Sequence, residues 1–173
     1  LISLSEQDLV DCSGDWGNGG CNGGWPQMAF EYIRDVGGVN TEDQYPYLAY
    51  DDSCHHDSSA IGATVENYVD IPTADEAAMQ DAIQNLGPVS ISIDASWGSF
   101  SGYSSGVYYE PKCDQYSLDH AVLAVGFGEE DGQEYWLVKN SWDDSWGENG
   151  YIKMARNRDN NCGVATSACY PVV

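Results

Sequence analysis

The apolar pattern of the chain changes at Gly87-Pro88, and this change constrains the fold more than any other feature. Helix signals precede it, and short β-rich segments bounded by glycines or acidic turns follow it. These segments are residues 89–93, 107–109, 121–127, 135–139 and 151–154. The order predicts an α+β fold with a helical lobe and an antiparallel, β-barrel-like lobe. We expect the helical lobe in residues 1–66, mainly the β lobe in residues 67–173, and a binding groove between them.

Three helices are predicted ahead of this change, and each opens at a recognisable signal. The signals are capping boxes at Ser5 with Asp8 and at Thr73 with Glu76, and a first-turn proline at Pro26. The first helix should end by Cys12 or Ser13, the second near Asp35, and the third before Gly87. Residues 15–24 hold five glycines and are predicted to form a loop.

Charge limits the possible partners. The chain carries 28 acidic and 6 basic residues, a formal net charge of −22, so its field repels nucleic acid. No apolar run is long enough to span a bilayer, and we expect no membrane span. An acidic compartment would protonate some of these carboxylates, which suits a lysosomal or digestive setting. The alternative interpretation of the charge is simply high solubility.

The six cysteines are too dispersed for a zinc ribbon and favour disulfides formed in an oxidising compartment. They are Cys12, Cys21, Cys54, Cys113, Cys162 and Cys169. Their spacing alone does not choose between the possible pairings. The segment 54–57, Cys-His-His-Asp, is predicted to be an exposed loop with no ligand role, because adjacent residues on a short loop rarely converge on one ion. We expect neither a metal nor a cofactor.

His120 and Asn140 lie on apolar, strand-like segments and suggest catalysis. A thiol nucleophile needs an imidazole that takes its proton, and the imidazole needs a fixed hydrogen-bonding group that holds its tautomer and ring plane. The two residues would supply that base and its orienting group. The alternatives are a core histidine satisfied by the backbone and an asparagine in a strand-end turn. Serine and metal hydrolases are disfavoured. His-Glu-x-x-His does not occur, and the one Gly-x-Ser-x-Gly match, residues 102–106, is followed by the strand-like segment 107–109 and not by the helix that a nucleophile elbow requires.

Eight short stretches carry a family resemblance that covers essentially the whole chain. They are residues 4–12, 20–24, 45–47, 87–89, 119–121, 139–142, 146–151 and 162–163. Each is weak alone, but in this order they are specific: the chain resembles the papain family of cysteine peptidases, and most closely its cathepsin L-like members. The resemblance implies endopeptidase hydrolysis of peptide and protein substrates by a thiolate. It implies that His120 is the ion-pair partner and later the acid, that Asn140 holds the imidazole, and that Trp142 shields their hydrogen bond. Core packing is the alternative role for Trp142.

The resemblance also implies substrate-binding positions. Gly23 and Gly24 match a backbone strip that pairs with an extended peptide, although a tight turn would also need glycines. The main specificity pocket and its surroundings are matched by Trp25, Pro26, Ser92, Leu118, Asp119, Ala121 and Ser167. The pocket lining is largely apolar, which favours a hydrophobic or aromatic substrate side chain, while Ser92 and Ser167 add polarity at its floor. Trp97 lies where the family shapes the leaving-group side, or is an exposed loop aromatic.

By this mapping the family's nucleophilic cysteine and oxyanion-hole glutamine lie upstream of Leu1. We therefore expect the chain alone to be inactive. The hypotheses are a partial sequence, a two-chain enzyme, or a non-catalytic homologue that binds peptides or protease inhibitors. Implied partners of the enzyme are a propeptide and cystatin-like inhibitors. The localisation implied is lysosomal or extracellular and digestive.

The same mapping implies disulfides Cys12–Cys54 and Cys113–Cys162. It leaves Cys21 unpaired in this chain, with its partner in the missing N-terminal segment. Cys169 has no family counterpart and is either a free thiol or bridged to Cys21. Asp143 stands where the family has glycine, so either the turn beside Asn140 is altered or it needs no positive φ.

Overall fold

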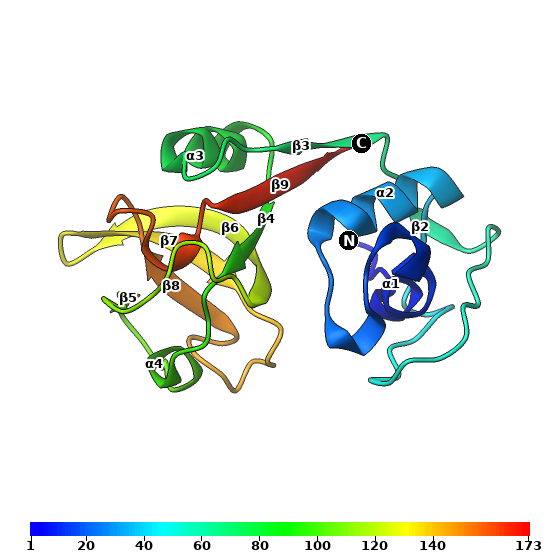
Figure 1. Cartoon of the computed structure of the whole chain (residues 1–173), viewed down its shortest axis with the longest axis horizontal. Coiled ribbons are helices and arrows are strands. Elements are labelled where there is room, and N and C mark those ends of the chain that lie inside the picture. Colours follow the sequence, from blue (N-terminus) through cyan, green and yellow to red (C-terminus); the bar gives the residue numbers. More distant parts are fainter. The chain divides into compact units, whose positions relative to one another are not determined.

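The computed structural model describes residues 1–173, which divide into two units (Figure 1). The first unit contains residues 1–69 and 171–173, and the second contains residues 70–170. The sequence placed the boundary at residue 66 and assigned the C-terminus to the β lobe. The last residues instead return to the first unit, where the Glu66 N–H donates to the Val172 carbonyl at 2.8 Å.

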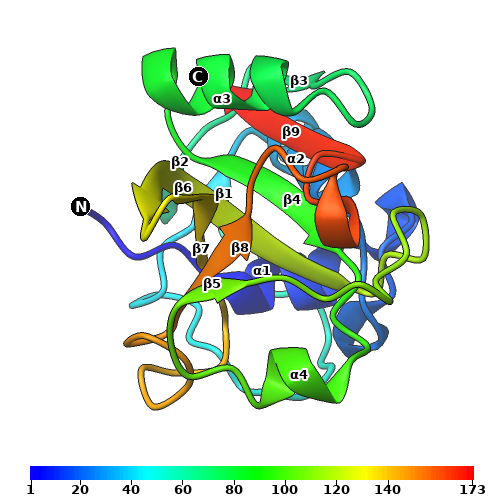
Figure 2. The same cartoon turned by 90° about the vertical axis from the view of Figure 1, so that its left-hand side faces the viewer.

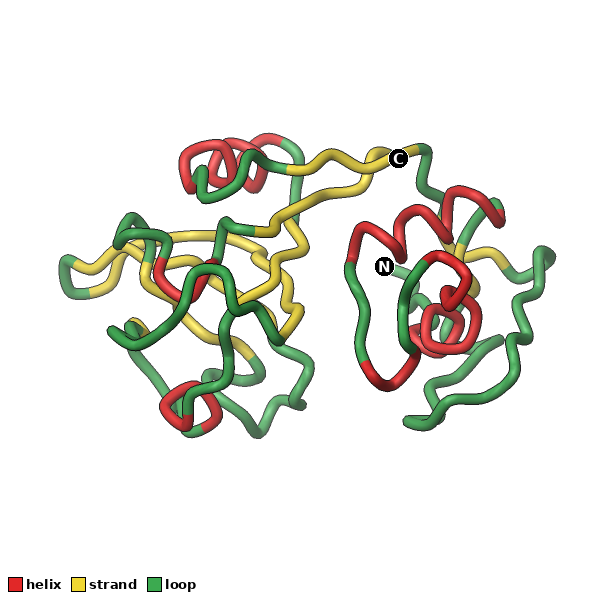
Figure 3. Tube along the Cα trace, in the orientation of Figure 1, coloured by secondary structure: helices red, strands yellow, loops and turns green.

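Helices α1 (Glu6–Cys12) and α2 (Pro26–Val36) form most of the helical structure of the first unit (Figure 3). The Ser5 hydroxyl accepts the Asp8 N–H at 2.9 Å and caps α1, as the sequence predicts. Pro26 begins α2. Proline suits this first position, because an N–H there has no partner within the helix. Gly37 ends α2 at φ 90°, a left-handed conformation that favours glycine.

The segment between α1 and α2 is more regular than the loop predicted for it. It forms two 3₁₀ helices, Ser13–Trp16 and Gly20–Asn22. Each is followed by a glycine with positive φ, which lets the chain reverse after a single short turn. Beyond α2, strands β1 (Val39–Asn40) and β2 (Ile61–Ala63) pair antiparallel and complete the unit.

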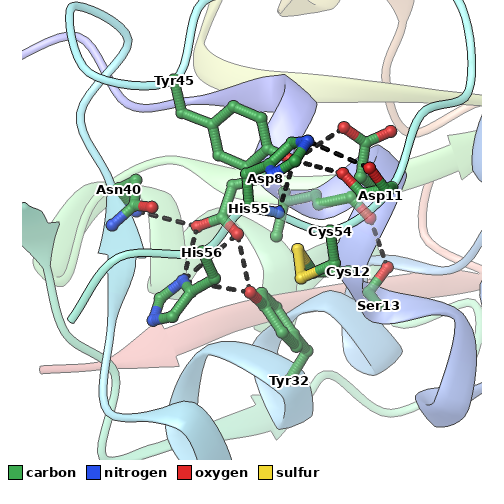
Figure 4. Close-up of a disulfide and its surroundings, with 12 residues drawn as sticks. Asp8, Asp11, Cys12, Ser13, Tyr32, Asn40, Tyr45, Cys54, His55 and His56 are labelled. Atoms are coloured by element: carbon green, nitrogen blue, oxygen red, sulfur yellow. Dashed lines mark hydrogen bonds and ion pairs between the residues drawn. A yellow bond between two sulfur atoms is a disulfide. The ribbon is translucent and has the colours of Figure 1, made fainter.

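The core of the first unit includes Cys12, which forms a disulfide with the exposed Cys54, and it lies next to a fully buried carboxylate, Asp8 (Figure 4). Asp8 accepts the Tyr32 hydroxyl at 2.6 Å and lies 3.2 Å from Nδ1 of His56. The expectation of an exposed loop at residues 54–57 is therefore wrong for His56. Its ring is drawn inward because a buried carboxylate needs polar partners that solvent cannot supply.

An open seven-stranded sheet includes all the strands of the second unit (Figure 2). Its order is β3-β9-β4-β6-β7-β8-β5. The strands are β3 (Asn67–Asp70), β4 (Val89–Ile93), β5 (Val107–Tyr108), β6 (His120–Glu130), β7 (Gln133–Lys139), β8 (Tyr151–Ala155) and β9 (Ser167–Val172). The α+β architecture is confirmed, with two differences: the sheet does not close into a barrel, and β5 pairs parallel with β8.

The β6–β7 hairpin turns at Asp131-Gly132, which have φ 50° and 78°. Positive φ at both central residues is the turn geometry that matches strand twist, and Asp-Gly adopts it readily. Helix α3 (Glu76–Asn85) packs beside β4 and β6. Its cap is not the predicted Thr73: the Asp75 carboxylate accepts the Ala78 N–H at 2.9 Å. No helix in the structure combines the length and apolar character needed to cross a membrane.

Candidate active site

Strand pairing brings His120 and Asn140 together from positions 20 residues apart. His120 opens β6 and pairs with Ile93 of β4. Asn140 directly follows Lys139, the last residue of β7, and Lys139 pairs with Leu123 of β6. Because β6 and β7 are antiparallel, the beginning of one strand lies beside the end of the other. The two side chains therefore lie at the same end of the hairpin, opposite the turn.

The His120 Nε2 lies 2.8 Å from the Asn140 Oδ1, and a second bond fixes the amide orientation. The Ser141 N–H donates to the same oxygen at 2.8 Å, so this atom must be the carbonyl oxygen and not the amide nitrogen. An acceptor facing Nε2 requires the proton there. The neutral imidazole then has its basic lone pair on Nδ1, which has no hydrogen-bond partner within the chain.

Aromatic rings surround this pair. Trp142 lies 5.1 Å from the His120 ring, centroid to centroid, at an interplanar angle of 35°, and is 39% exposed. Phe100, from the short helix α4 (Gly98–Ser101), is fully buried and lies 6.0 Å from His120 and 5.5 Å from Trp142. Trp146 lies 5.4 Å from Trp142. The sequence did not identify Phe100, because nothing in its local pattern indicates contact with a histidine 20 residues away.

The turn after Asn140 requires a left-handed residue. Asp143 has φ 66°, so the suggestion that this turn needs no positive φ is wrong. The Asp143 Oδ1 accepts the N–H of Asp144 at 2.7 Å, a local bond that helps aspartate to adopt this conformation. The Asn140 N–H donates to the Gly150 carbonyl at 2.9 Å, which holds the other side of the turn.

Three of the expected pocket residues form one row across the sheet. Ser92 of β4 pairs with Ala121 on one side and with Ser167 on the other. Directly opposed residues of antiparallel strands point to the same face, so these small side chains share a face. Ser92 is buried and Ala121 is exposed. Leu118 is half-buried, and its side chain occupies the space that a Cβ on Gly163 would need.

The other two expected residues of the second unit make structural bonds. The Asp119 N–H donates to the Ile93 carbonyl at 3.0 Å, and its carboxylate accepts the Ala95 N–H at 2.8 Å. The Trp97 indole is half-buried and donates to the Asp94 Oδ2 at 3.1 Å. Trp97 is therefore held by a carboxylate at one end of the ring, unlike a freely exposed loop aromatic.

The remaining expected residues lie in the first unit. Gly23, Gly24 and Trp25 are exposed, and Trp25 shows 49% of its surface. Gly23 has φ 102°, so glycine is required there for the backbone alone. Pro26 is half-buried at the start of α2.

The cysteines pair as the resemblance implies. Disulfides join Cys12 to Cys54 and Cys113 to Cys162, while Cys21 is an exposed free thiol and Cys169 a buried one. The unusual bridge between the last two does not form. Burial raises the pKa of the Cys169 thiol to about 12. Desolvation and the neighbouring Asp51 carboxylate raise the pKa of Cys21. Neither thiol is set up to act as a thiolate.

Comparison with known proteins gives consistent matches. The family model described as papain family cysteine protease matches residues 1–172. A cathepsin L-like peptidase of Aedes aegypti is 63% identical to the chain; the match covers the whole chain and 51% of the relative. Digestive cysteine proteinase 1 of Homarus americanus is 60% identical to the chain; the match covers the whole chain and 54% of that relative. The chain thus spans about half the length of the curated relatives it matches.

Solved structures agree. The structure of digestive procathepsin L 3 from the larval midgut of Tenebrio molitor matches the whole chain and 56% of its own length, with a TM-score of 0.97 at 48% identity. The bromelain protease of Ananas comosus, solved in complex with the E64 inhibitor, matches the whole chain and 79% of its own length, with a TM-score of 0.92 at 39% identity. Sequence and fold agree from end to end, and the chain belongs to the papain family of cysteine proteases.

Proposed function

We propose that the full-length protein is a cysteine endopeptidase, with His120 as its catalytic base and acid and Asn140 as the group that orients the imidazole. One observation carries this proposal: the His120 Nε2 is bonded to the Asn140 Oδ1 at 2.8 Å while Nδ1 has no partner. A base must keep one nitrogen for the proton that it takes. Trp142, whose ring is tilted by 35° to the His120 ring at 5.1 Å, would limit water at the Nε2 bond and so keep it strong.

The nucleophile would be a cysteine outside the 173 residues of this sequence. Four of the six cysteines are in disulfides, and the pKa of each of the two free thiols is raised. A catalytic thiol needs the opposite shift, because the thiolate is the reactive species. The proposal therefore expects this chain alone not to hydrolyse peptides.

In the proposed reaction the external thiol gives its proton to His120 Nδ1, and the resulting thiolate attacks the scissile carbonyl carbon. The tetrahedral intermediate collapses as the C–N bond breaks, and the imidazolium donates its proton to the leaving amine. Water then attacks the thioester, with the neutral imidazole taking one proton of the water. That proton returns to the thiol as the acid product leaves. Asn140 holds the ring plane through these proton transfers.

Substrate recognition is proposed for the residues that match the family's binding positions. Gly23 and Gly24 would pair with the backbone of an extended peptide, and Trp25 and Pro26 would lie beside it. A substrate side chain would lie against a largely apolar lining that includes the expected residues Ser92, Leu118, Asp119, Ala121 and Ser167. We expect a hydrophobic or aromatic side chain there, and Trp97 on the leaving-group side.

Further partners are proposed from the same family relationship. They are a propeptide, cystatin-like inhibitors, and a cysteine in another segment that would form a disulfide with the exposed Cys21 thiol. The setting would be lysosomal or extracellular and digestive. Two disulfides fit a secretory route, and the name of the Homarus relative, digestive cysteine proteinase 1, supports the digestive setting.

The test is hydrolysis of a fluorogenic peptide by the full-length protein and by its His120→Ala variant. Loss of the base should lower kcat about 10³-fold or more, with an unchanged melting temperature. His55→Ala is the matched control, because His55 is exposed and its ring contacts Ser53 and Tyr45 in the first unit. Turnover by His120→Ala within tenfold of the unmodified protein would reject the catalytic role.

A further inference from the structure

The segment Gly23–Trp25 presents an open backbone edge. All three residues are exposed, and neither the N–H nor the C=O of Gly24 has a hydrogen-bond partner within the chain. Trp25 continues the segment in an extended conformation, with φ −117° and ψ 136°. A free donor and acceptor on exposed backbone are what an added peptide strand requires.

The Asn18 side chain bonds this backbone edge to the rest of the first unit. Its Oδ1 accepts the Trp25 N–H at 2.8 Å, and its Nδ2 donates to the Ser13 hydroxyl at 2.9 Å. The fully buried Ser13 in turn donates to the Leu9 carbonyl of α1 at 2.6 Å. Three consecutive bonds therefore connect the edge to the last turn of a helix held by the Cys12 disulfide.

Two further contacts limit the movement of the edge. The Gly19 N–H donates to the Gly23 carbonyl at 2.8 Å, so the segment is held at both ends. A Cβ on Gly24 would collide with the Asn18 amide, which shows how closely the side chain lies under the backbone. Because the inward N–H of Trp25 is taken by Asn18, the polar groups of Gly24 remain directed away from the body of the unit.

We infer that Asn18 is a positioning residue that presents the Gly24 backbone to the main chain of an extended peptide substrate. The inference rests on the proposed peptidase function and adds a determinant of substrate affinity. Asn18 is not proposed to touch the reacting groups. Its loss should therefore weaken substrate binding in the ground and transition states alike, which raises KM and leaves kcat unchanged.

The experiment measures KM and kcat of the full-length protein for a blocked tripeptide amide with a fluorescent leaving group. Asn18→Ala should raise KM about fivefold to tenfold, with kcat within about twofold. Asn18→Asp keeps the acceptor for the Trp25 N–H but loses the donor to Ser13, so it should recover only part of the loss. Asn22→Ala is the matched control, because Asn22 lies in the same loop and its side chain makes no hydrogen bond. If Asn18→Ala does not fold, Asn18→Ser should show the same rise in KM.

A second substrate tests the backbone contact itself. Replacing one substrate N–H by an ester oxygen removes a donor that the Gly24 carbonyl would accept. This change should raise KM for the unmodified protein and raise it less for Asn18→Ala, because that variant has already lost the contact. A KM within twofold for Asn18→Ala, or equal ester penalties in both proteins, would overturn the inference alone. No peptide hydrolysis by the unmodified protein would overturn the proposed function and this inference together.

Discussion

At the scale of single residues, Asn140 depends on its neighbours for its orientation. Its Oδ1 accepts both the His120 ring N–H and the Ser141 N–H, and a flipped amide would place two donors against each other at both contacts. The Asn140 side chain is almost fully buried, so an unmade bond would not be replaced by water. The turn that follows therefore matters to the site, because it determines where the Ser141 amide points.

The left-handed conformation of Asp143 in that turn predicts how a substitution there changes stability. A left-handed conformation is costly for a residue with a Cβ, so Asp143→Gly should raise the free energy of unfolding by about 0.5–1 kcal/mol. Urea unfolding measures the change. Asp144→Gly is the control and should give no increase, because Asp144 has no positive φ. A lower midpoint for Asp143→Gly would mean that the Asp143–Asp144 bond outweighs the backbone cost.

At the scale of elements, the helix and strand signals near the site were local and largely correct. The strand at residues 89–93 has the predicted bounds, and α2 ends one residue later than expected. Strands β3 and β9 were missed. They are neighbours in the sheet although about 100 residues separate them in the sequence, and neither shows the alternation of a strand with one buried face.

The cap of α3 tests how far local capping signals can be trusted. Asp75 accepts the Ala78 N–H, whereas Thr73 lies two residues before that cap. Asp75→Ala should lower the free energy of unfolding by about 1 kcal/mol, and Thr73→Ala should change it by less than about 0.5 kcal/mol. Denaturant unfolding of both variants compares them directly. A larger loss for Thr73→Ala would restore the cap that the sequence suggested.

At the scale of the whole molecule, two effects of pH oppose each other. The net charge of −22 favours expansion at neutral pH, and partial protonation relieves it as the pH falls. Other carboxylates contribute to the stability of the fold only while they are charged. Burial acts to raise the pKa of Asp94, but hydrogen bonds from Ser96, Asp114 and Trp97 outweigh it and hold the pKa below its usual value. Hydrogen bonds from Lys153, Tyr103 and Gly106 likewise outweigh burial and lower the pKa of Glu148.

The charge repulsion and the lowered pKa values together predict that the protein is most stable in mild acid. A carboxylate with a lowered pKa contributes stability above its unfolded pKa of about 4, and the contribution is lost as the pH falls through the folded value. The melting temperature should therefore rise from pH 7 to about pH 5 and fall below about pH 4. Roughly 0.5 M salt should flatten the rise, because it screens the repulsion. A melting temperature that falls steadily from pH 7 at low salt would contradict the charge argument.

The sequence by itself determined the features that depend on neighbours along the chain. The Ser5 cap, the Pro26 helix start and the strand at 89–93 are recognisable because a cap or an alternating strand involves residues only a few positions apart. The order of helices and strands determined the α+β class for the same reason. His120 and Asn140 were identified as candidates from residue type and context.

Tertiary structure decided everything that depends on register and distant contact. Only strand pairing sets His120 against Asn140, and only packing places Phe100 beside the imidazole. The inward turn of His56 onto Asp8 joins residues 48 positions apart. Closing such contacts costs chain entropy that only the whole fold repays, so no short window of sequence can show which of them form.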